Sequence, residues 1–248
     1  MPLVSIITPV DFRAGDHLAA AYDSVVEQVL PAGWEWEWLV HVDGGVAPEW
    51  LLAVQDDRVR SSMNDQKRGP AAVRNMLLAR SQGSHVKVLD ADDQLALGAV
   101  ARDLTVIDEF PRVTWVTSRA RDLREDGTFA DVANPPPGLI GQGDVFHYWK
   151  AHNFLLPVHP ATLFAKRGAV VALGGWTSVP TSEDTGLLLA LNCCEQGYFI
   201  DECGLIYRKW AKQLTAQAHH LSERHLLMRC SLIAQRCELL LQSVSVPG

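Results

Sequence analysis

The chain has 248 residues, of which 48% are hydrophobic and 21% are charged, and its formal net charge at pH 7 is −7. This length and apolar content suit one large α/β domain and exclude a disordered chain. The net negative charge argues against a general nucleic-acid-binding protein, and no stretch of the sequence approaches the roughly 18–20 apolar residues of a membrane span.

The N-terminal segment and the cysteines bear on cellular location. The segment MPLVSIITPV has neither the basic region nor the cleavage motif of a secretory signal, so we expect no signal peptide. The cysteines are odd in number and show no C-x-x-C spacing, which favours reduced thiols over disulfides or a zinc site. We therefore expect a cytoplasmic protein, or one peripheral to a membrane, with free thiols at Cys193, Cys194, Cys203, Cys230 and Cys237.

The first half of the chain alternates between apolar runs and amphipathic segments. The β-branched run at residues 3–8 predicts a buried strand, and the helical spacing of apolar residues over 16–30 predicts a helix with Asp16 as its candidate N-cap. A second strand is expected at 34–42, before a turn at Asp43. This β-α-β order predicts a mostly parallel sheet with right-handed crossovers. The further elements expected in this half are a helix at 70–82, a strand at 85–90, a helix at about 95–109 and a strand at 112–118.

The second half of the chain is less regular. Residues 126–144 include three consecutive prolines and several glycines, which predicts a loop. We expect a main domain over residues 1–215 and a C-terminal helical extension, residues 216–248, that packs on it as one structural unit. The elements expected after the loop are a strand, turn and helix within 158–176, a capped helix within 181–197, one or two strands within 198–210 and an amphipathic helix at 219–242.

Three carboxylates follow the strand expected at residues 85–90, namely Asp90, Asp92 and Asp93. Ligands of open α/β sheets bind beyond the carboxyl ends of the strands, and closely spaced carboxylates there need a counter-charge. A divalent cation supplies that charge, because Mg²⁺ or Mn²⁺ takes one or two carboxylates together with phosphate oxygens. The acidic turn therefore predicts a clamp for a metal-bound diphosphate, although a solvated turn that caps the next helix would have the same sequence.

A further carboxylate and a basic group lie at neighbouring turns. Asp43, in VDGG, can accept a hydrogen bond from a nucleoside, or it can belong to a plain Asp-Gly turn. Lys67 and Arg68 precede a helix, where a cation can meet a phosphate, or they are solvated loop charges. Asn75, which follows Arg74 inside that helix, is a mild cost in helix propensity, and this indicates a hydrogen-bonding role.

Acidic residues also open the helix expected within 181–197. Thr181 and Asp184 have the spacing of a capping box, which gives both residues a structural explanation. Asp184, with Glu183 beside it, is equally suited to be a general base, provided that it comes within about 2.6–3.2 Å of the hydroxyl proton that it removes. Both explanations stay open at the level of the sequence.

Taken in chain order, these residues form one pattern. It consists of VSIITPV, VDGG, RGPAAVRN, VLDADD, VHPATLFAKRG, GGW, SEDTGLLLAL and YRKW. Over roughly residues 3–214, the pattern resembles glycosyltransferase family 2, whose members are inverting enzymes with the GT-A nucleotide-sugar fold. The resemblance implies a GT-A fold, a nucleotide-sugar donor with UDP favoured, a divalent cation (Mg²⁺ or Mn²⁺) as cofactor, and a hydroxyl-bearing acceptor.

The resemblance also assigns roles to individual residues. Asp92 and Asp93 match the metal-binding DxD-type motif, with Asp90 in support, and Asp184 matches the catalytic base of the family's ED motif. The donor-binding residues implied are Thr8, Pro9, Asp43, Lys67, Arg68, Arg74, Asp92 and Glu183, and the region of the donor sugar or acceptor is that of His159 and Trp176.

The sequence departs from the family pattern at two places. Val42 and Gly45 stand where the family has the first Asp and the Ser of its DDGS turn, which leaves the donor base open. Arg208, Lys209 and Trp210 stand after the final strand, where the family often has a His or Arg, so a third metal ligand is not evident.

The mechanism that the resemblance implies is a single in-line displacement with inversion, in which Asp184 takes the proton of an acceptor hydroxyl and the metal neutralises the leaving nucleoside diphosphate. A nucleotidyltransferase is one alternative, but it would need a Gly-rich phosphate loop near the first strand, where only Arg13 and Gly15 occur. A non-catalytic nucleotide-sugar-binding relative is another, but such a protein would not need a base. The acceptor is either a small molecule or a cell-surface precursor.

Two remaining patterns indicate packing. Trp34, Trp36 and Trp38 alternate on one face of an expected strand, and we interpret them as core or interface residues rather than as a platform for a sugar. The C-terminal helix is amphipathic, and its apolar stripe would serve equally to cover the sheet, to close the acceptor site or to form a homodimer.

Overall fold

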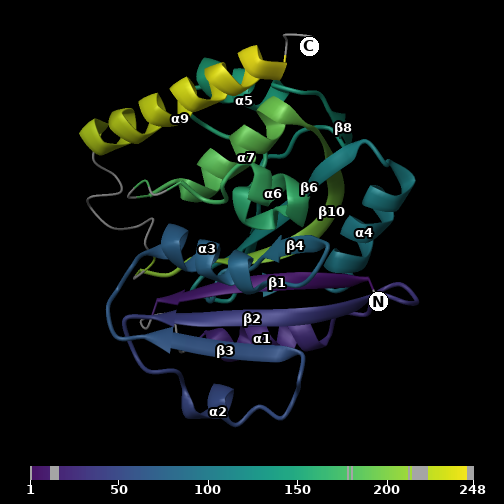
Figure 1. The fold of residues 1–248 in the computed structure, drawn as a ribbon, viewed down its shortest axis with the longest axis vertical. Coiled ribbons are helices and arrows are strands. Elements are labelled where there is room, and N and C mark those ends of the chain that lie inside the picture. Colours follow the sequence, from purple (N-terminus) through teal and green to yellow (C-terminus); the bar gives the residue numbers. More distant parts are fainter. Residues whose placement is uncertain are drawn as a thin grey trace.

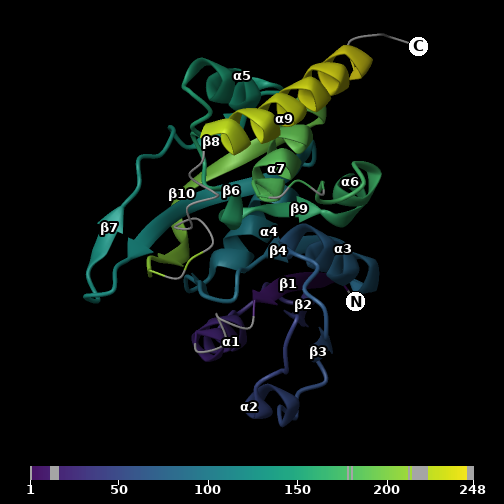
Figure 2. The ribbon, with the colours of Figure 1, turned by 90° about the vertical axis from the view of Figure 1, so that its left-hand side faces the viewer.

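The structure is a computed structural model that describes residues 2–11, 17–177, 179, 181–211, 213 and 223–244. One large sheet runs through the molecule, and helices cover both of its faces (Figures 1 and 2). The strands are β1 (Leu3–Asp11), β2 (Glu35–Asp43), β3 (Val59–Asn64), β4 (His85–Val88), β5 (Gln94–Leu95), β6 (Val113–Leu123), β7 (Phe129–Asp131), β8 (Gly138–Ile140), β9 (Phe164–Lys166) and β10 (Gln196–Arg208). The helices are α1 (Leu18–Val26), α2 (Glu49–Leu52), α3 (Pro70–Arg80), α4 (Ala99–Glu109), α5 (Asp144–Ala151), the 3-10 helix η2 (Pro160–Thr162), α6 (Arg167–Ala172), α7 (Glu183–Cys194) and α9 (Glu223–Val244).

The sheet is parallel in its first half and mixed in its second. Within the described part of the chain it has ten strands, in the order β3-β2-β1-β4-β9-β6-β10-β5, with β7 paired to β6 and β8 paired to β10. β1 pairs in parallel with β2 and β4, as the sequence predicts. β9 lies antiparallel between β4 and β6, so the expectation of a mostly parallel sheet is wrong for the second half. A three-residue strand has no directional pattern of its own, and only its neighbours decide how it runs.

The bounds of α1 and α4 both differ from the sequence prediction. α4 begins at Ala99 rather than at about residue 95, because residues 94–95 form β5 and Leu95 pairs with Leu205 of β10. The first helix ends at Val26, earlier than expected. Its candidate N-cap, Asp16, lies outside the described residues, as do Arg13 and Gly15.

Residues 126–144, expected to form a loop, contain two short strands and lead into α5. β7 pairs with the end of β6, where Asp131 lies opposite Arg121, and β8 pairs with β10, where Ile140 lies opposite Gly197. β3 is a further strand that the sequence analysis did not predict. Its residues are half-buried or exposed, so hydrogen bonding to β2, rather than an apolar run, makes it a strand.

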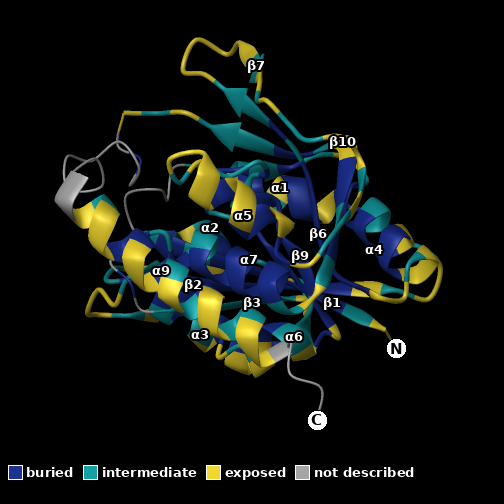
Figure 3. Ribbon diagram, turned by 90° about the horizontal axis from the view of Figure 1, so that it is seen from above, coloured by how far each residue is buried: buried dark blue, intermediate teal, exposed yellow. Residues whose placement is uncertain are grey.

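Apolar side chains pack on both faces of the sheet, whose strands are mostly buried (Figure 3). Trp36 and Trp38 are both buried in the core cluster that includes α1 and α4, which confirms the packing explanation for this stripe. Lys87 of β4 is also fully buried, and its Nζ donates to Asp103 Oδ2 at 2.7 Å and to the Thr162 carbonyl at 2.8 Å. The ion pair with Asp103 fastens α4 to the sheet, and the hydrogen bond to Thr162 fastens η2.

The C-terminal helix α9 lies along α7, at the end of the molecule remote from α2 (Figure 1). Its inner residues are buried and its outer residues are exposed (Figure 3), and Lys150 of α5 forms an ion pair with Glu238 at 2.6 Å. α9 is the longest of the described helices, yet none of them is long and apolar enough to cross a membrane. The domain boundary expected after residue 215 falls outside the described residues.

Candidate active site

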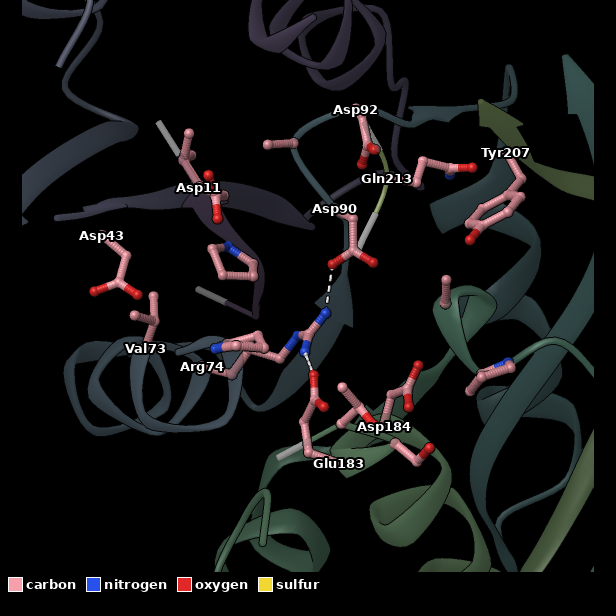
Figure 4. A pocket seen from close by; sticks show the side chains of 18 of the residues that line it. Asp11, Asp43, Val73, Arg74, Asp90, Asp92, Glu183, Asp184, Tyr207 and Gln213 are labelled. Carbon is pink, nitrogen blue, oxygen red and sulfur yellow. Dashed lines mark hydrogen bonds and ion pairs between the residues drawn. The ribbon is translucent and has the colours of Figure 1, made fainter. Parts of the chain in front are cut away.

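A cavity of about 340 Å³ opens at the edge of the sheet where β1, β2 and β4 end. It is bounded by the first turns of α3 and α7, by the turn after β4 and by the residues that follow β10 (Figure 4). This is the edge of the sheet at which α/β proteins bind ligands. The predicted site residues that line the cavity are Pro9, Asp43, Lys67, Arg74, Asp92, His159, Glu183 and Asp184.

Arg74 connects the acidic turn to the start of α7. Its side chain is buried, and its two terminal nitrogens donate to Asp90 Oδ1 and Glu183 Oε1 from opposite sides (Figure 4). Burial alone would lower the pKa of Arg74, but the carboxylates of Asp90, Glu183 and Asp184 raise it above its usual range. Burial raises the pKa of Glu183, and Arg74 opposes that effect. Arg74 is therefore a permanent cation that brings two distant acidic segments to one cavity.

Asp184 follows Glu183 on α7, and its side chain lines the cavity on the side across from Asp90 (Figure 4). α7 begins after Ser182, whose backbone is left-handed with a φ of 69°, and no side chain of a described residue caps its first turn. The capping box predicted from Thr181 and Asp184 is therefore wrong, because the helix begins one residue later than that motif requires. Asp184 Oδ1 accepts the N–H of Thr185 at 2.6 Å. Asp184 Oδ2 has no hydrogen bond to the described residues.

The acidic turn after β4 presents one carboxylate to the cavity and buries another. Asp92 lines the cavity, and its Oδ2 accepts the indole N–H of Trp210 at 2.7 Å. Asp93 is 1% exposed and does not line the cavity, and its Oδ1 accepts the backbone N–H of Arg208 at 2.8 Å. Burial and the neighbouring acids raise the pKa of Asp93 well above its usual range. Burial and Asp90 raise the pKa of Asp92, while the hydrogen bond from Trp210 opposes them.

This group of carboxylates fits a divalent cation. Asp93 Oδ2 is buried and has no hydrogen-bond partner in the described part of the chain, so it is left to take a proton or to bind a cation. The two permanent cations among the described lining residues, Lys67 and Arg74, already form ion pairs with Asp11, and with Asp90 and Glu183, respectively. No three His, Cys, Asp or Glu side chains in the described ranges make a complete metal site. Two carboxylates plus ligand phosphates are a usual set for Mg²⁺.

Asp43 holds the loop before α3. Its carboxylate accepts the backbone N–H groups of Arg68, at 2.9 and 3.1 Å, and of Gly69, at 2.8 Å, and also the side-chain amide of Asn64 at 3.2 Å. It lines the cavity with most of its hydrogen-bonding capacity already used. Lys67, from the same loop, lines the cavity as well. Asp43 therefore shapes this wall as a part of the loop, which the sequence alone does not show.

Three other predicted residues lie outside the cavity lining. Thr8 is fully buried and accepts the indole N–H of Trp38 at 2.9 Å, and Arg68 is exposed on the loop before α3. Trp176 is 2% exposed in the core that includes α3 and α7, which corrects the expectation that it faces the donor sugar or the acceptor. Its backbone N–H and carbonyl both bond to the side chain of Asn75, at 2.9 and 2.8 Å. This pair of bonds bears out the hydrogen-bonding role expected for Asn75.

The end of β10 supplies a wall that the sequence analysis did not assign. Tyr207, Trp210 and Gln213 line the cavity. The ring of Tyr207 lies 4.6 Å from the ring of His159, centroid to centroid. Burial lowers the pKa of His159, and its Nδ1 has no hydrogen-bond partner in the described part of the chain. The only sequence signal for this wall was the position of YRKW after the last strand.

The fold is that of a known class of proteins. The structure of S. aureus TarS 1-349 in complex with UDP-GlcNAc matches this chain with a TM-score of 0.73 at 16% sequence identity, over 98% of this chain and 71% of that one. The complex of S. aureus TarS 1-349 with UDP matches with a TM-score of 0.70 at 15% identity, over 98% and 70%. At this level of identity the likeness establishes the fold, which is the GT-A fold of glycosyltransferases.

Sequence comparison identifies the family. The profile described as "Glycosyl transferase family 2" matches residues 5–157, which is more than half of the chain. An "Uncharacterized glycosyltransferase" of Haemophilus influenzae is 30% identical over 109 residues. That match spans 42% of this chain and 42% of the relative, so the chain aligns with less than half of that protein's length. The chain belongs to glycosyl transferase family 2.

Proposed function

We propose that this chain is an inverting glycosyltransferase that moves a sugar from a nucleoside diphosphate to an acceptor hydroxyl. The observation that supports this most directly is the double ion pair of Arg74. It brings the acidic turn, suited to a metal-bound diphosphate, and the start of α7, which has a carboxylate free to take a proton, to the same cavity. A binding protein would need only the first of these two parts.

The donor nucleoside belongs, in this proposal, at the side of the cavity formed by the ends of β1 and β2. Asp43 lies at that side, away from the wall made by Tyr207 (Figure 4), and Pro9 and Lys67 belong to the same cavity lining. UDP is the donor nucleotide that we favour, because the S. aureus TarS 1-349 structures of similar fold hold UDP and UDP-GlcNAc. Arg74 lies between this side and Asp184 (Figure 4). Because its charge is already paired with Asp90 and Glu183, the positive charge that a diphosphate needs there would come from the divalent cation.

Asp92 and Asp93 are the residues that we propose to hold Mg²⁺ or Mn²⁺. Asp92 would do so from the cavity lining, and Asp93 through Oδ2, the buried oxygen without a hydrogen bond among the described residues. When bound, the cation would supply charge neutralisation for the departing nucleoside diphosphate. The chain itself holds this acidic turn in place through Arg208 and Trp210.

Asp184 is the base in this proposal. Its Oδ1 is held by the N–H of Thr185, so Oδ2 is the oxygen available for the proton of the acceptor hydroxyl. The acceptor oxygen forms a bond to the anomeric carbon of the sugar while the bond from that carbon to the diphosphate oxygen breaks, and the electron pair leaves with the diphosphate. One displacement inverts the configuration. Glu183 is not suited to this role, because its carboxylate is buried against Arg74.

The proposal also includes the kind of acceptor and the cellular location of the protein. His159 and Tyr207, whose rings are in contact, line the cavity together with Asp184. We propose that these polar groups bind a hydroxyl-bearing acceptor, either a small molecule or a cell-surface precursor. The cytoplasm is the location that we favour, because an odd number of cysteines without C-x-x-C spacing suits a reducing compartment. The homodimer expected from the sequence stays a prediction.

The experiment that tests the proposal incubates the purified chain with a panel of nucleotide sugars and Mn²⁺ and measures release of the nucleoside diphosphate. We expect slow hydrolysis of at least one UDP-sugar. Asp184→Asn should bind UDP like the wild type and lower turnover by about 10²–10⁴-fold, the usual contribution of a general base. Asp57→Asn, at an exposed carboxylate outside the cavity, is the matched control. Normal turnover by Asp184→Asn would refute the base, and absence of turnover with every donor would favour the non-catalytic alternative.

A further inference from the structure

The residues that end β10 lie directly against the acidic turn, although the two segments are more than a hundred positions apart. Three hydrogen bonds join them. The indole N–H of Trp210 donates to Asp92 Oδ2 at 2.7 Å, the backbone N–H of Arg208 donates to Asp93 Oδ1 at 2.8 Å, and Arg208 Nε donates to the Asp92 carbonyl at 3.0 Å. The turn is therefore held both by its backbone and by its side chains.

Trp210 differs from Arg208 in what it fixes. The two bonds of Arg208 hold the Asp92 backbone and the buried Asp93, whereas Trp210 bonds to the one carboxylate of this pair that lines the cavity. An indole N–H is a donor only, so it can bond to Asp92 but cannot replace it as a ligand for a cation. With Oδ2 occupied by Trp210, rotation of the Asp92 carboxylate is restricted, and Oδ1 is the oxygen left for a cation.

The orientation of Trp210 is itself determined by its neighbours. The ring of His17 packs edge-on against its indole with the centroids 5.0 Å apart. The side chain of Gln213 donates to the Arg208 carbonyl, which closes the turn that follows β10. The indole thus has a defined position before any ligand binds, while one part of it still faces the cavity. A preorganised donor of this kind costs little reorganisation when a ligand arrives.

We propose that Trp210 is a positioning residue, whose indole N–H orients the carboxylate of Asp92 for a divalent cation and so for the metal-bound diphosphate of the donor. The inference rests on the proposed function, because it is in that reaction that Asp92 has a cation to hold. It goes beyond that function because it gives the segment after β10 a role in metal binding. No residue of that segment is proposed as a metal ligand.

The test compares the wild type with Trp210→Phe, which keeps an aromatic ring but removes the N–H group together with the second ring of the indole. Trp34→Phe, at a half-buried tryptophan outside the cavity, is the matched control. Binding of Mn²⁺ alone is titrated by the paramagnetic resonance signal of the free ion, and binding of UDP is measured by calorimetry with Mn²⁺ and with a chelator. We expect Trp210→Phe to weaken Mn²⁺ binding and Mn²⁺-dependent UDP binding by about tenfold, the effect of one hydrogen bond to a charged group.

The chelator measurement separates positioning from a simple wall contact. UDP binding in chelator should be the same for Trp210→Phe and the wild type, and an equal loss with and without metal would overturn the proposal. Unchanged Mn²⁺ affinity in Trp210→Phe would also overturn it. If the wild type binds Mn²⁺ but no nucleotide, the proposed function fails, and the titration with Mn²⁺ alone still decides the role of Trp210.

A double-mutant cycle with Asp92→Asn gives a second readout that a change in fold stability would not reproduce. If Trp210 acts through Asp92, Trp210→Phe should weaken Mn²⁺-dependent UDP binding in the wild type and have little further effect in the Asp92→Asn background. Fully additive losses would show that the two residues act independently, and this would contradict the proposal.

Discussion

Arg74 and Glu183 are 109 positions apart in the chain and form an ion pair in which both side chains are more than nine-tenths buried. The same guanidinium also bonds to Asp90. Because Glu183 is committed to Arg74, the neighbouring Asp184 is the acid of this pair that can exchange a proton with a substrate. One buried cation thus joins the two segments that meet at the cavity and leaves Asp184 as the acid that we propose as the base.

Loss of Arg74 should destabilise the protein strongly. Arg74→Gln leaves the buried Glu183 carboxylate without its cation, and breaking a buried pair in this way costs about 3–5 kcal/mol in the free energy of unfolding. Adding Glu183→Gln should recover part of the loss, because the unpaired charge is then removed. The control is Arg58→Gln, which breaks the exposed pair with Asp56 and should cost less than about 1 kcal/mol. Denaturant unfolding of the wild type and the three variants measures these differences, and equal costs for Arg74→Gln and Arg58→Gln would contradict the assignment.

Replacing Asp92 or Asp93 by Asn should have different effects on the stability of the protein. Asp92→Asn and Asp93→Asn should each weaken Mn²⁺-dependent UDP binding, measured by calorimetry. Only Asp93→Asn should also raise the stability of the protein in chelator, because it removes a buried charge whose Oδ2 has no partner among the described residues. A loss of stability in chelator as large as that of a core substitution would show that the folded chain compensates the charge of Asp93.

His85 makes the stability of the fold sensitive to acid. Burial, with Lys166 nearby, lowers the pKa of His85 to about 4 from an ordinary value of 6.5. Between these two values the unfolded chain binds a proton that the folded chain does not, so stability falls as the pH falls from 6.5 to 4. His85→Gln should therefore lose less stability than the wild type over this range. Urea unfolding at several pH values measures the slopes, and parallel slopes would show that His85 does not contribute.

The contact between Asn75 and the segment before α7 should affect both stability and turnover. Asn75→Ala leaves the backbone N–H and carbonyl of Trp176 without their partner and should cost about 1–3 kcal/mol in the free energy of unfolding. In Gly175→Ala the new methyl group would lie 2.1 Å from Asn75 Oδ1, in a backbone with φ of +70°. Gly175→Ala should therefore cost more alone than in the Asn75→Ala background.

The same variants test whether this contact positions the base. Because residues 174–176 lead into α7, both substitutions should lower turnover more than they weaken UDP binding. Gln235→Ala, on the exposed face of α9, is the control and should leave both quantities unchanged. A proportional loss of binding and turnover would mean that Asn75 supports the whole fold rather than the position of Asp184.

The strands with continuous buried stretches are those that the sequence predicts best. β1, β2 and β4 pair in parallel as expected, because their buried residues form continuous stretches that only a covered strand accommodates. The short strands β7 and β8 escape such prediction, and so does the antiparallel direction of β9, a strand that the sequence does predict within 158–176. Each has three residues, and each is a strand because a neighbour in the sheet offers it hydrogen bonds.

By itself, the sequence determined the kind of chemistry this protein holds: an acidic turn after a strand, acids at a helix start, and the family to which these motifs belong. Only the tertiary structure decided the contacts and the burial of each of those residues. It paired Glu183 with Arg74, buried Asp93, turned Trp176 into the core and brought Trp210 to Asp92. The physical reason is that residue type and periodicity are local properties, whereas the environment of a charged group depends on segments that reach it from distant parts of the chain.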